Sequence, residues 1–170
     1  MRHSSNSSGI FSFAIGCILL MCLSCNSKME ELDLDSPPKL KSGFLAKRFQ
    51  FPVGKGDTSA YYNAQGFGGK HNHLGDDWNA VTGGNTDLGH PIYLCANGYV
   101  KEAKDFKGGW GNVIRVVHFL ENDTVESLYA HCDKILVKKG SWIEQGTQIG
   151  TIGTAHGQYL AHLHFEIRED

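Results

Sequence analysis

Hydrophobic and polar residues alternate with a period of two along most of the chain after Phe44, which is the pattern of half-buried β-strands. The run 111–121 is the clearest case, because Val113, Arg115 and Val117 alternate with residues of the opposite face. Six further strands are predicted at 92–95, 99–103, 125–132, 135–137, 147–152 and 162–167. No segment carries the pattern of an amphipathic helix, so we predict an all-β, largely antiparallel domain that resembles a β-sandwich.

Turn-forming pairs separate the predicted strands, as at Asn97-Gly98 and Lys139-Gly140. The chain has 21 glycines, where average composition would give about 12. Two long glycine-rich stretches, 54–72 and 151–161, are predicted to be loops, and each leads into a segment that bears histidines. We therefore expect these loops to border a groove.

The N-terminal residues differ from the rest of the chain. Arg2 precedes an apolar run over residues 10–23, which is shorter than the roughly 20 apolar residues that span a bilayer and has the length of a signal-peptide core. The following Ser24-Cys25 resembles the lipobox of bacterial lipoproteins, in which the cysteine is acylated after cleavage. We therefore expect a signal peptide of the lipoprotein type over residues 1–24 and a lipid on Cys25. A plain secretory signal and a short transmembrane anchor are the alternatives.

Residues 25–43 are polar and acidic with a Pro-Pro pair, and we predict a flexible tether there, ahead of a domain over residues 44–170. A plain disordered N-terminus would have the same composition. A lipid on Cys25 would anchor an exported protein to a membrane of the periplasm or cell envelope. The 16 basic and 18 acidic side chains are interspersed, and no basic patch with interleaved aromatics indicates a nucleic-acid partner. We expect a monomer.

Two cysteines, Cys95 and Cys132, lie in apolar strand-like runs, and we predict that they are buried thiols. A disulfide in an oxidising compartment is the alternative. Cys132 follows His131, but adjacent strand residues face opposite sides, so these two do not form a nucleophile pair.

The candidate chemistry lies among the nine histidines. His162 and His164 are two apart on a predicted strand and therefore share a face. His73 and Asp77 are four apart in a segment that Gly75 makes extended, so they share a face too. Imidazole and carboxylate are ligands that Zn²⁺ accepts, and three protein ligands with an open fourth position form the catalytic pattern, in which bound water has a pKa of about 7.

Spacing alone leaves the choice of ligands open. His71 and His73 form a second His-x-His pair, which could hold a metal with Asp76 or Asp77. The sequence has no His-Glu-x-x-His motif, so the helical metalloprotease arrangement is absent.

An ordered series of motifs favours one choice. From about residue 67 to 167 the chain resembles the lysostaphin-like (LytM-type) zinc endopeptidases of the bacterial cell wall. The matching motifs are His73-Leu74-Gly75-Asp76-Asp77, Gly89-His90-Pro91-Ile92, Gly98-Tyr99-Val100, the run 111–118, Tyr129-Ala130-His131-Cys132 and His162-Leu163-His164-Phe165-Glu166. Several separate motifs in the right order are more specific than any one of them.

The resemblance implies that His73, Asp77 and His164 bind one Zn²⁺ per chain, and that His131 and His162 are the catalytic pair. One of the pair would take a proton from water, and either could stabilise the oxyanion or protonate the leaving amine. The implied function is hydrolysis of a peptide bond in the stem or cross-link of peptidoglycan.

Two other functions are weighed beside it. A non-catalytic relative would bind or activate a wall hydrolase, although such relatives usually lack the zinc ligands. A cupin-like metal-binding barrel would use the pair His71 and His73. Among the remaining residues, we predict a structural role for His118, and loop positions for His71, His90 and His156. Aromatic residues that could line a peptide groove are Tyr61, Tyr62, Trp78 and Trp110.

Overall fold

The computed structural model describes residues 38–169. The predicted signal peptide, the lipidation site at Cys25 and the tether up to residue 37 lie outside the described residues and stay predictions. Within residues 38–169, no helix has the length and apolar character needed to cross a membrane.

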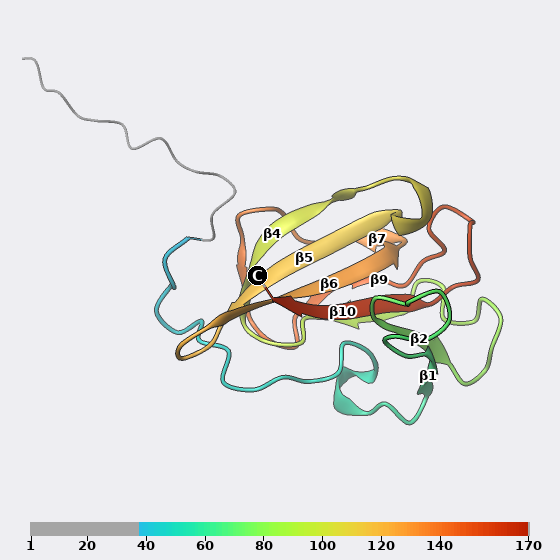
Figure 1. Ribbon diagram of the computed structural model, residues 1–170, viewed down its shortest axis with the longest axis horizontal. Coiled ribbons are helices and arrows are strands. Elements are labelled where there is room, and N and C mark those ends of the chain that lie inside the picture. Colours follow the sequence, from blue (N-terminus) through green and yellow to red (C-terminus); the bar gives the residue numbers. More distant parts are fainter. Residues whose placement is uncertain (1–37, 170) are drawn as a thin grey trace, which may run out of the picture. The chain divides into compact units, whose positions relative to one another are not determined.

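The described residues form ten strands and two short 3-10 turns (Figure 1). The strands are β1 (Tyr61–Gln65), β2 (Asp76–Ala80), β3 (Pro91–Tyr93), β4 (Gly98–Asp105), β5 (Asn112–Phe119), β6 (Thr124–Cys132), β7 (Lys134–Ile135), β8 (Trp142–Ile143), β9 (Gln148–Thr151) and β10 (Leu163–Glu169), and the turns are η1 (Gly54–Gly56) and η2 (Gly108–Trp110). Seven strands make one sheet in the order β1-β2-β10-β6-β5-β4-β8, and β3-β9-β7 make a second. All strand pairs in the two sheets are antiparallel, so the predicted fold class is confirmed.

Seven of these ten strands are predicted from the sequence, whereas the edge strands β1 and β8 and the strand β2 are not. The prediction that residues 54–72 form only a loop is wrong, because β1 lies inside that range. β1 pairs with β2 alone, and its three central residues are exposed, so no buried face imposes alternation on it. At the other edge, β8 has only two residues, both half-buried, and pairs with β4 alone.

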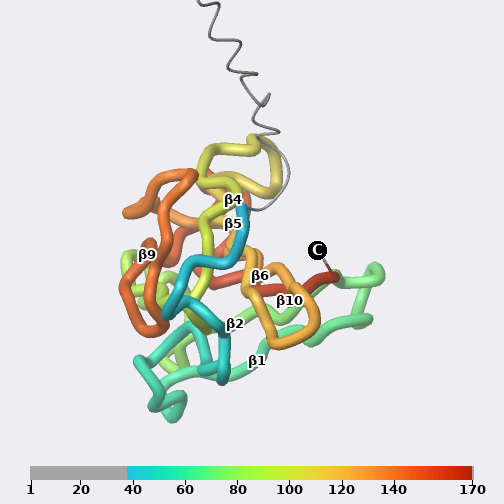
Figure 2. The backbone as a smooth tube through the Cα atoms, turned by 90° about the vertical axis from the view of Figure 1, so that its left-hand side faces the viewer, coloured from blue at the N-terminus to red at the C-terminus, as the bar shows by residue number. Residues whose placement is uncertain are grey.

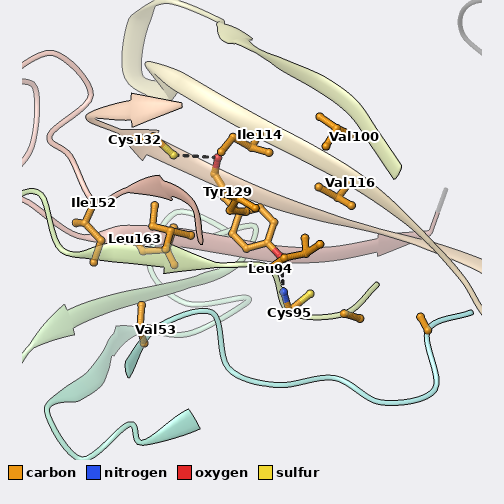
Figure 3. Packing of buried hydrophobic residues seen from close by; sticks show 14 of the residues in the cluster. Val53, Leu94, Cys95, Val100, Ile114, Val116, Tyr129, Cys132, Ile152 and Leu163 are labelled. Atoms are coloured by element: carbon orange, nitrogen blue, oxygen red, sulfur yellow. Dashed lines mark hydrogen bonds between the residues drawn. The ribbon is translucent and has the colours of Figure 1, made fainter. Parts of the chain in front are cut away.

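The main hydrophobic core lies between the two sheets (Figures 2 and 3). The large sheet contributes Ile114, Tyr129 and Leu163, and the small sheet contributes Ile92 and Ile149, all fully buried. Full burial of such side chains stabilises the fold by roughly 1.5–3 kcal/mol each. The face of the large sheet that meets the small sheet is called the inner face below, and the opposite face is called the outer face.

The inner face also buries polar groups, and those around His118 have partners. His118 Nδ1 donates to the carbonyl of Asn97 at 2.9 Å, and His118 Nε2 lies 2.7 Å from the Ser127 hydroxyl. The Cys95 amide donates to the Tyr129 hydroxyl at 3.0 Å (Figure 3). The predicted structural role of His118 is consistent with these contacts, and Cys95, like Cys132, is a free buried cysteine as predicted.

Candidate metal centre

Asp77 and His164 meet on the outer face of the large sheet, where β2 pairs with β10. They are direct cross-strand partners, and β10 also pairs with β6 on its other side. Because side chains alternate along β10, the fully buried Leu163 points into the core, and His164 points to the outer face. The carboxylate oxygen Oδ1 of Asp77 lies 2.9 Å from His164 Nδ1.

Gly75 brings His73 to the same place. A Cβ atom at residue 75 would lie 2.2 Å from the carbonyl oxygen of Phe165 and 2.6 Å from Cγ of Glu166. Only glycine therefore allows the segment before β2 to pass so close to β10. The segment places His73 Nε2 at 3.0 Å from His164 Nδ1 and 3.1 Å from Asp77 Oδ1.

The three candidate ligand atoms thus form a nearly equilateral triangle, with sides of 2.9, 3.0 and 3.1 Å. A tetrahedral zinc ion with bonds of about 2.0–2.1 Å holds its ligand atoms about 3.3–3.4 Å apart. The triangle would need to open by only a few tenths of an ångström. Two imidazoles and one carboxylate are also a donor set that zinc accepts, so the residues present fit this metal.

The outward-facing nitrogen of each site histidine has an acceptor. Nδ1 of His73, His131 and His162 donates to the backbone carbonyls of Gly66, Trp110 and Leu160, at 3.3, 3.3 and 2.8 Å. His164 instead uses Nε2, which donates to the carboxylate of Glu166 at 2.8 Å. These bonds fix the tautomer of each neutral ring, so the lone pairs of the other nitrogens converge on the cleft.

The carboxylates around His164 favour the protonated, positively charged form of its ring. Burial lowers the pKa of His164, but hydrogen bonds to Asp77 and Glu166 outweigh it and raise this pKa to about 9. Burial likewise opposes the charged form of Glu166, yet hydrogen bonds from His164 and Arg168 lower the pKa of its carboxyl group. Without a metal, the imidazolium therefore carries on Nδ1 the proton that a metal ion would replace.

His131 and His162 form a second pair beside the triangle. Their ring centroids lie 4.8 Å apart, and His162 Nε2 lies 3.6 Å from Asp77 Oδ1. Gly153 makes their approach possible, because a Cβ atom there would lie 2.3 Å from the carbonyl oxygen of His131. Burial, followed by electrostatic repulsion of the protonated ring by His162 and His164, lowers the pKa of His131 to about 4. His131 is therefore neutral at pH 7 and can accept a proton.

All five predicted site residues line one open cleft of about 550 Å³. Of the aromatic residues proposed for the groove, Trp110 lines this cleft, whereas Tyr61 and Trp78 pack against the core. Sequence reasoning missed Tyr159, whose ring lies 5.0 Å from that of His131. Its place in a glycine-rich loop gave no periodic signal.

The second His-x-His pair is divided in the structure. His71 lines the cleft, but among the described residues the group that could hold a metal comprises only His73, Asp77 and His164. Asp76 turns away, since its Oδ1 accepts from the Phe67 amide at 3.2 Å.

Residues 71–170 match the family model for Peptidase family M23. The chain belongs to this family. Its antiparallel fold and the site just described agree with membership, and the family excludes the cupin-like barrel.

Three M23-related proteins show how the similarity is distributed. The chain is 41% identical over 80 residues to "Lipoprotein NlpD" of Yersinia enterocolitica, covering 47% of this chain and 78% of that one. It is 35% identical over 99 residues to "Murein hydrolase activator NlpD" of Escherichia coli (strain K12), covering 55% and 25%. It is 34% identical over 82 residues to "Peptidoglycan DD-endopeptidase ShyB" of Vibrio cholerae, covering 48% and 18%. The chain thus spans a quarter or less of the last two proteins.

Solved structures agree with the M23 fold. The peptidase lysostaphin of Staphylococcus simulans is 27% identical with a TM-score of 0.54, over 64% of this chain and 42% of that one. A zinc-containing peptidase from Vibrio cholerae is 27% identical with a TM-score of 0.51, over 73% and 37%. The protein therefore contains a peptidase-type domain of a family related to peptidoglycan hydrolysis.

Proposed function

We propose that this M23 domain is a zinc-dependent endopeptidase that hydrolyses peptide bonds in the stem or cross-link of peptidoglycan. His73, Asp77 and His164 would hold one Zn²⁺, and His131 and His162 would be the catalytic residues. The observation that carries the proposal is the convergence of three ligand atoms at 2.9–3.1 Å with two further histidines beside them.

A bound zinc ion would supply Lewis acidity toward a peptide carbonyl and would activate a water molecule for attack. The chain's own residues account for the proton movements. Neutral His131 donates Nδ1–H to the Trp110 carbonyl, so its Nε2 lone pair can take a proton from the attacking water. His162 holds Nδ1–H on Leu160, and its Nε2 faces the cleft, where it can stabilise the oxyanion or transfer a proton to the leaving amine.

The cleft also suits an extended peptide. It is open to solvent, and Trp110 and Tyr159 line it beside the histidine pair. Asp77, the one carboxylate that lines the cleft in the described part of the chain, would be occupied by the metal. Similarity to ShyB, named as a peptidoglycan DD-endopeptidase, and to lysostaphin supports a wall peptide as the substrate.

A second function is favoured by different relatives. Several NlpD proteins to which the chain is similar are named murein hydrolase activators. An activator would need a surface for a partner enzyme and would have no use for five converging metal-ligand and proton-transfer groups. The complete site therefore favours the endopeptidase.

The deciding experiment compares metal content and hydrolysis. The full chain is purified in detergent, its bound metal is measured, and it is incubated with purified peptidoglycan. Mass spectrometry of the released fragments identifies the bond that is cut. We expect one zinc ion per chain and cleavage that chelators abolish.

Matched histidine variants assign the residues. His164→Ala should abolish zinc binding and cleavage, whereas His131→Ala should abolish cleavage and leave the zinc in place. His156→Ala is the control, because His156 is exposed and lies 3.2 Å from Asp105, outside the cleft. Cleavage that survives His164→Ala would refute the proposal. Zinc-free wild-type protein that stimulates another wall hydrolase would establish the activator instead.

We also propose that the protein is exported to the cell envelope and anchored there as a monomer through a lipid on Cys25. Names such as "Lipoprotein NlpD" and "Outer membrane antigenic lipoprotein B" among the relatives support this. Radiolabelled palmitate should enter the wild-type protein and not the Cys25→Ser variant. Equal labelling of both would refute lipidation at this residue.

A further inference from the structure

His164 is held differently from the other three site histidines. A backbone carbonyl fixes each of the other rings, but a carboxylate, that of Glu166, fixes His164. A side-chain acceptor such as the Glu166 carboxylate is less rigid than a backbone carbonyl unless other contacts fix its position. Glu166 is 3% exposed, so its negative charge also needs a compensating partner.

Arg168 supplies that partner. Side chains two apart on a strand share a face, so His164, Glu166 and Arg168 form a row on the outer face of β10. Arg168 Nε donates to Oε2 of Glu166, while Oε1 of the same carboxylate accepts from His164. Glu166 is thus held at both oxygens, between a ligand histidine and a guanidinium group.

The guanidinium group of Arg168 also lies near Trp110, the residue whose carbonyl orients His131, one of the two proposed catalytic histidines. Its Cζ atom lies 5.9 Å from the centroid of the Trp110 ring, within the range of a cation–π contact. The Trp110 carbonyl accepts from His131 Nδ1, and its ring lies edge-on to His164 at 5.7 Å. Trp110 ends the short turn η2, where Lys107, Gly108 and Gly111 all have positive φ. Arg168 therefore packs on the ring of the residue that orients His131.

We propose, building on the proposed zinc endopeptidase function, that Arg168 is a positioning residue shared by both halves of the site. It holds the ligand His164 through Glu166 and the catalytic His131 through Trp110. It contacts neither metal nor substrate. Loss of Arg168 would release both histidines from their fixed orientations, whereas an ordinary surface arginine would affect stability alone.

The outer face offers a matched control on the neighbouring strands. Arg115 of β5 donates to both oxygens of Glu126 at 2.6 and 2.8 Å, and Glu126 is 1% exposed. This pair resembles the Arg168–Glu166 pair in chemistry and burial, with Lys101 Nζ as a second cation 3.6 Å from Glu126 Oε2. No site histidine is bonded to Glu126. Arg115→Met therefore reports what losing a guanidinium–carboxylate pair does to stability alone.

The test uses the full chain in detergent as wild type, Arg168→Met, Arg168→Lys and Arg115→Met. Zinc affinity is measured by competition with a chromophoric chelator, and ligand geometry by the visible spectrum of the Co²⁺-substituted protein. The melting temperature of each metal-free protein reports stability. Arg168→Met should weaken zinc binding by about 10- to 100-fold and change the cobalt spectrum. Arg115→Met should lower the melting temperature and leave both metal readouts unchanged.

Arg168→Lys separates the two parts of the proposal, namely the contact with His164 through Glu166 and the contact with His131 through Trp110. It also replaces Arg168→Met if that variant does not fold. A lysine ammonium can pair with Glu166 but cannot also stack as a plane on Trp110. Zinc affinity should therefore recover, while kcat for peptidoglycan cleavage stays low with KM unchanged. Full recovery of kcat would refute the Trp110 part.

The two proposals fail in different ways. If the wild type binds zinc but Arg168→Met and Arg115→Met have equal zinc affinities, the positioning role is refuted and the endopeptidase stands. If the wild type binds no zinc, the endopeptidase proposal fails, and the positioning role fails with it.

Discussion

On the inner face of the seven-stranded sheet His118 is completely buried, and on the outer face His164 is 5% exposed, yet their pKa values move in opposite directions. Burial lowers the pKa of His118, and its bond to the Asn97 carbonyl offsets this only in part. Burial also opposes the charged form of His164, but the carboxylates of Asp77 and Glu166 raise its pKa to about 9. The partners of each ring, more than its burial, decide its charge.

The difference separates two uses of buried polar groups. On the inner face, neutral donors and acceptors such as Ser127 and Tyr129 satisfy one another and specify a single packing. On the outer face, the Asp77 carboxylate lies close to the histidine rings, and the atoms Asp77 Oδ1, His164 Nδ1 and His73 Nε2 converge on one point. The first arrangement stabilises the domain, and the second is a group of atoms that could hold a metal ion.

Replacing His164 or His118 by alanine should have the largest effects and therefore tests the difference between the two faces most directly. His164→Ala should lose measurable zinc binding, and it should also lower the stability of the metal-free protein, because Asp77 and the buried Glu166 lose the imidazolium that pairs with them. His118→Ala should keep zinc and lower the free energy of unfolding by about 2–4 kcal/mol, through a cavity and unpaired polar groups. Denaturant unfolding with chelator, beside a zinc titration, measures both. Zinc binding that is lost in His118→Ala and kept in His164→Ala would show that the two faces have been assigned the wrong way round.

A smaller effect is expected from the glycine that lets His73 approach the outer face. Gly75→Ala should cost about 1–3 kcal/mol of stability because its Cβ atom would overlap the backbone of β10. Zinc affinity should fall by about 10-fold or more as His73 moves away. Gly66→Ala is the control, since its Cβ atom would meet its nearest atoms at 3.6 Å. Equal zinc affinities for the two variants would contradict the close approach.

The dependence of stability on pH should sharpen the comparison on the inner face. The folded pKa of His118 lies below its ordinary value of 6.5, so the unfolded chain binds the proton first as the pH falls. The contribution of His118 is therefore complete above pH 6.5 and is lost as the pH falls toward the lowered folded pKa. One group changes stability by at most about 1.4 kcal/mol per pH unit.

Comparison with His118→Gln isolates this contribution from those of other histidines. Denaturant unfolding of metal-free protein between neutral and mildly acidic pH should give a shallower slope for the variant. Parallel slopes for the variant and the wild type would mean that His118 is not held neutral.

The smallest expected effect concerns the reactivity of Cys95 and Cys132, the two buried cysteines. Burial raises the pKa of the Cys95 thiol and raises that of Cys132 to about 12, so neither forms a reactive thiolate at neutral pH. We expect a thiol-specific chromogenic reagent to label neither cysteine in the native domain and both after unfolding. Rapid native labelling would show that the inner face opens.

The sequence pattern predicted seven of the strands, most of which place residues in the core; β6 is buried on both faces. The pattern missed β1, whose residues Tyr62 to Ala64 are exposed, because an edge strand with little burial has no reason to alternate. For the site, the pattern predicted His162 and His164 on one strand, but β10 begins at Leu163 and His162 lies one residue before it, bridged to Gly153. The pattern also placed Glu166 on the same face as His164, although no role for that residue was predicted from it.

The sequence by itself determined which residues can alternate into a core and which can bind a metal. Spacing alone left two His-x-His pairs open, and only the ordered family motifs favoured the pair of His162 and His164. Only the tertiary structure places Asp77 opposite His164 and leaves His71 outside the cluster. The physical reason is that pairing between β2 and β10 joins residues 87 positions apart. No local spacing encodes that contact, nor the one that brings Arg168 onto the ring of Trp110.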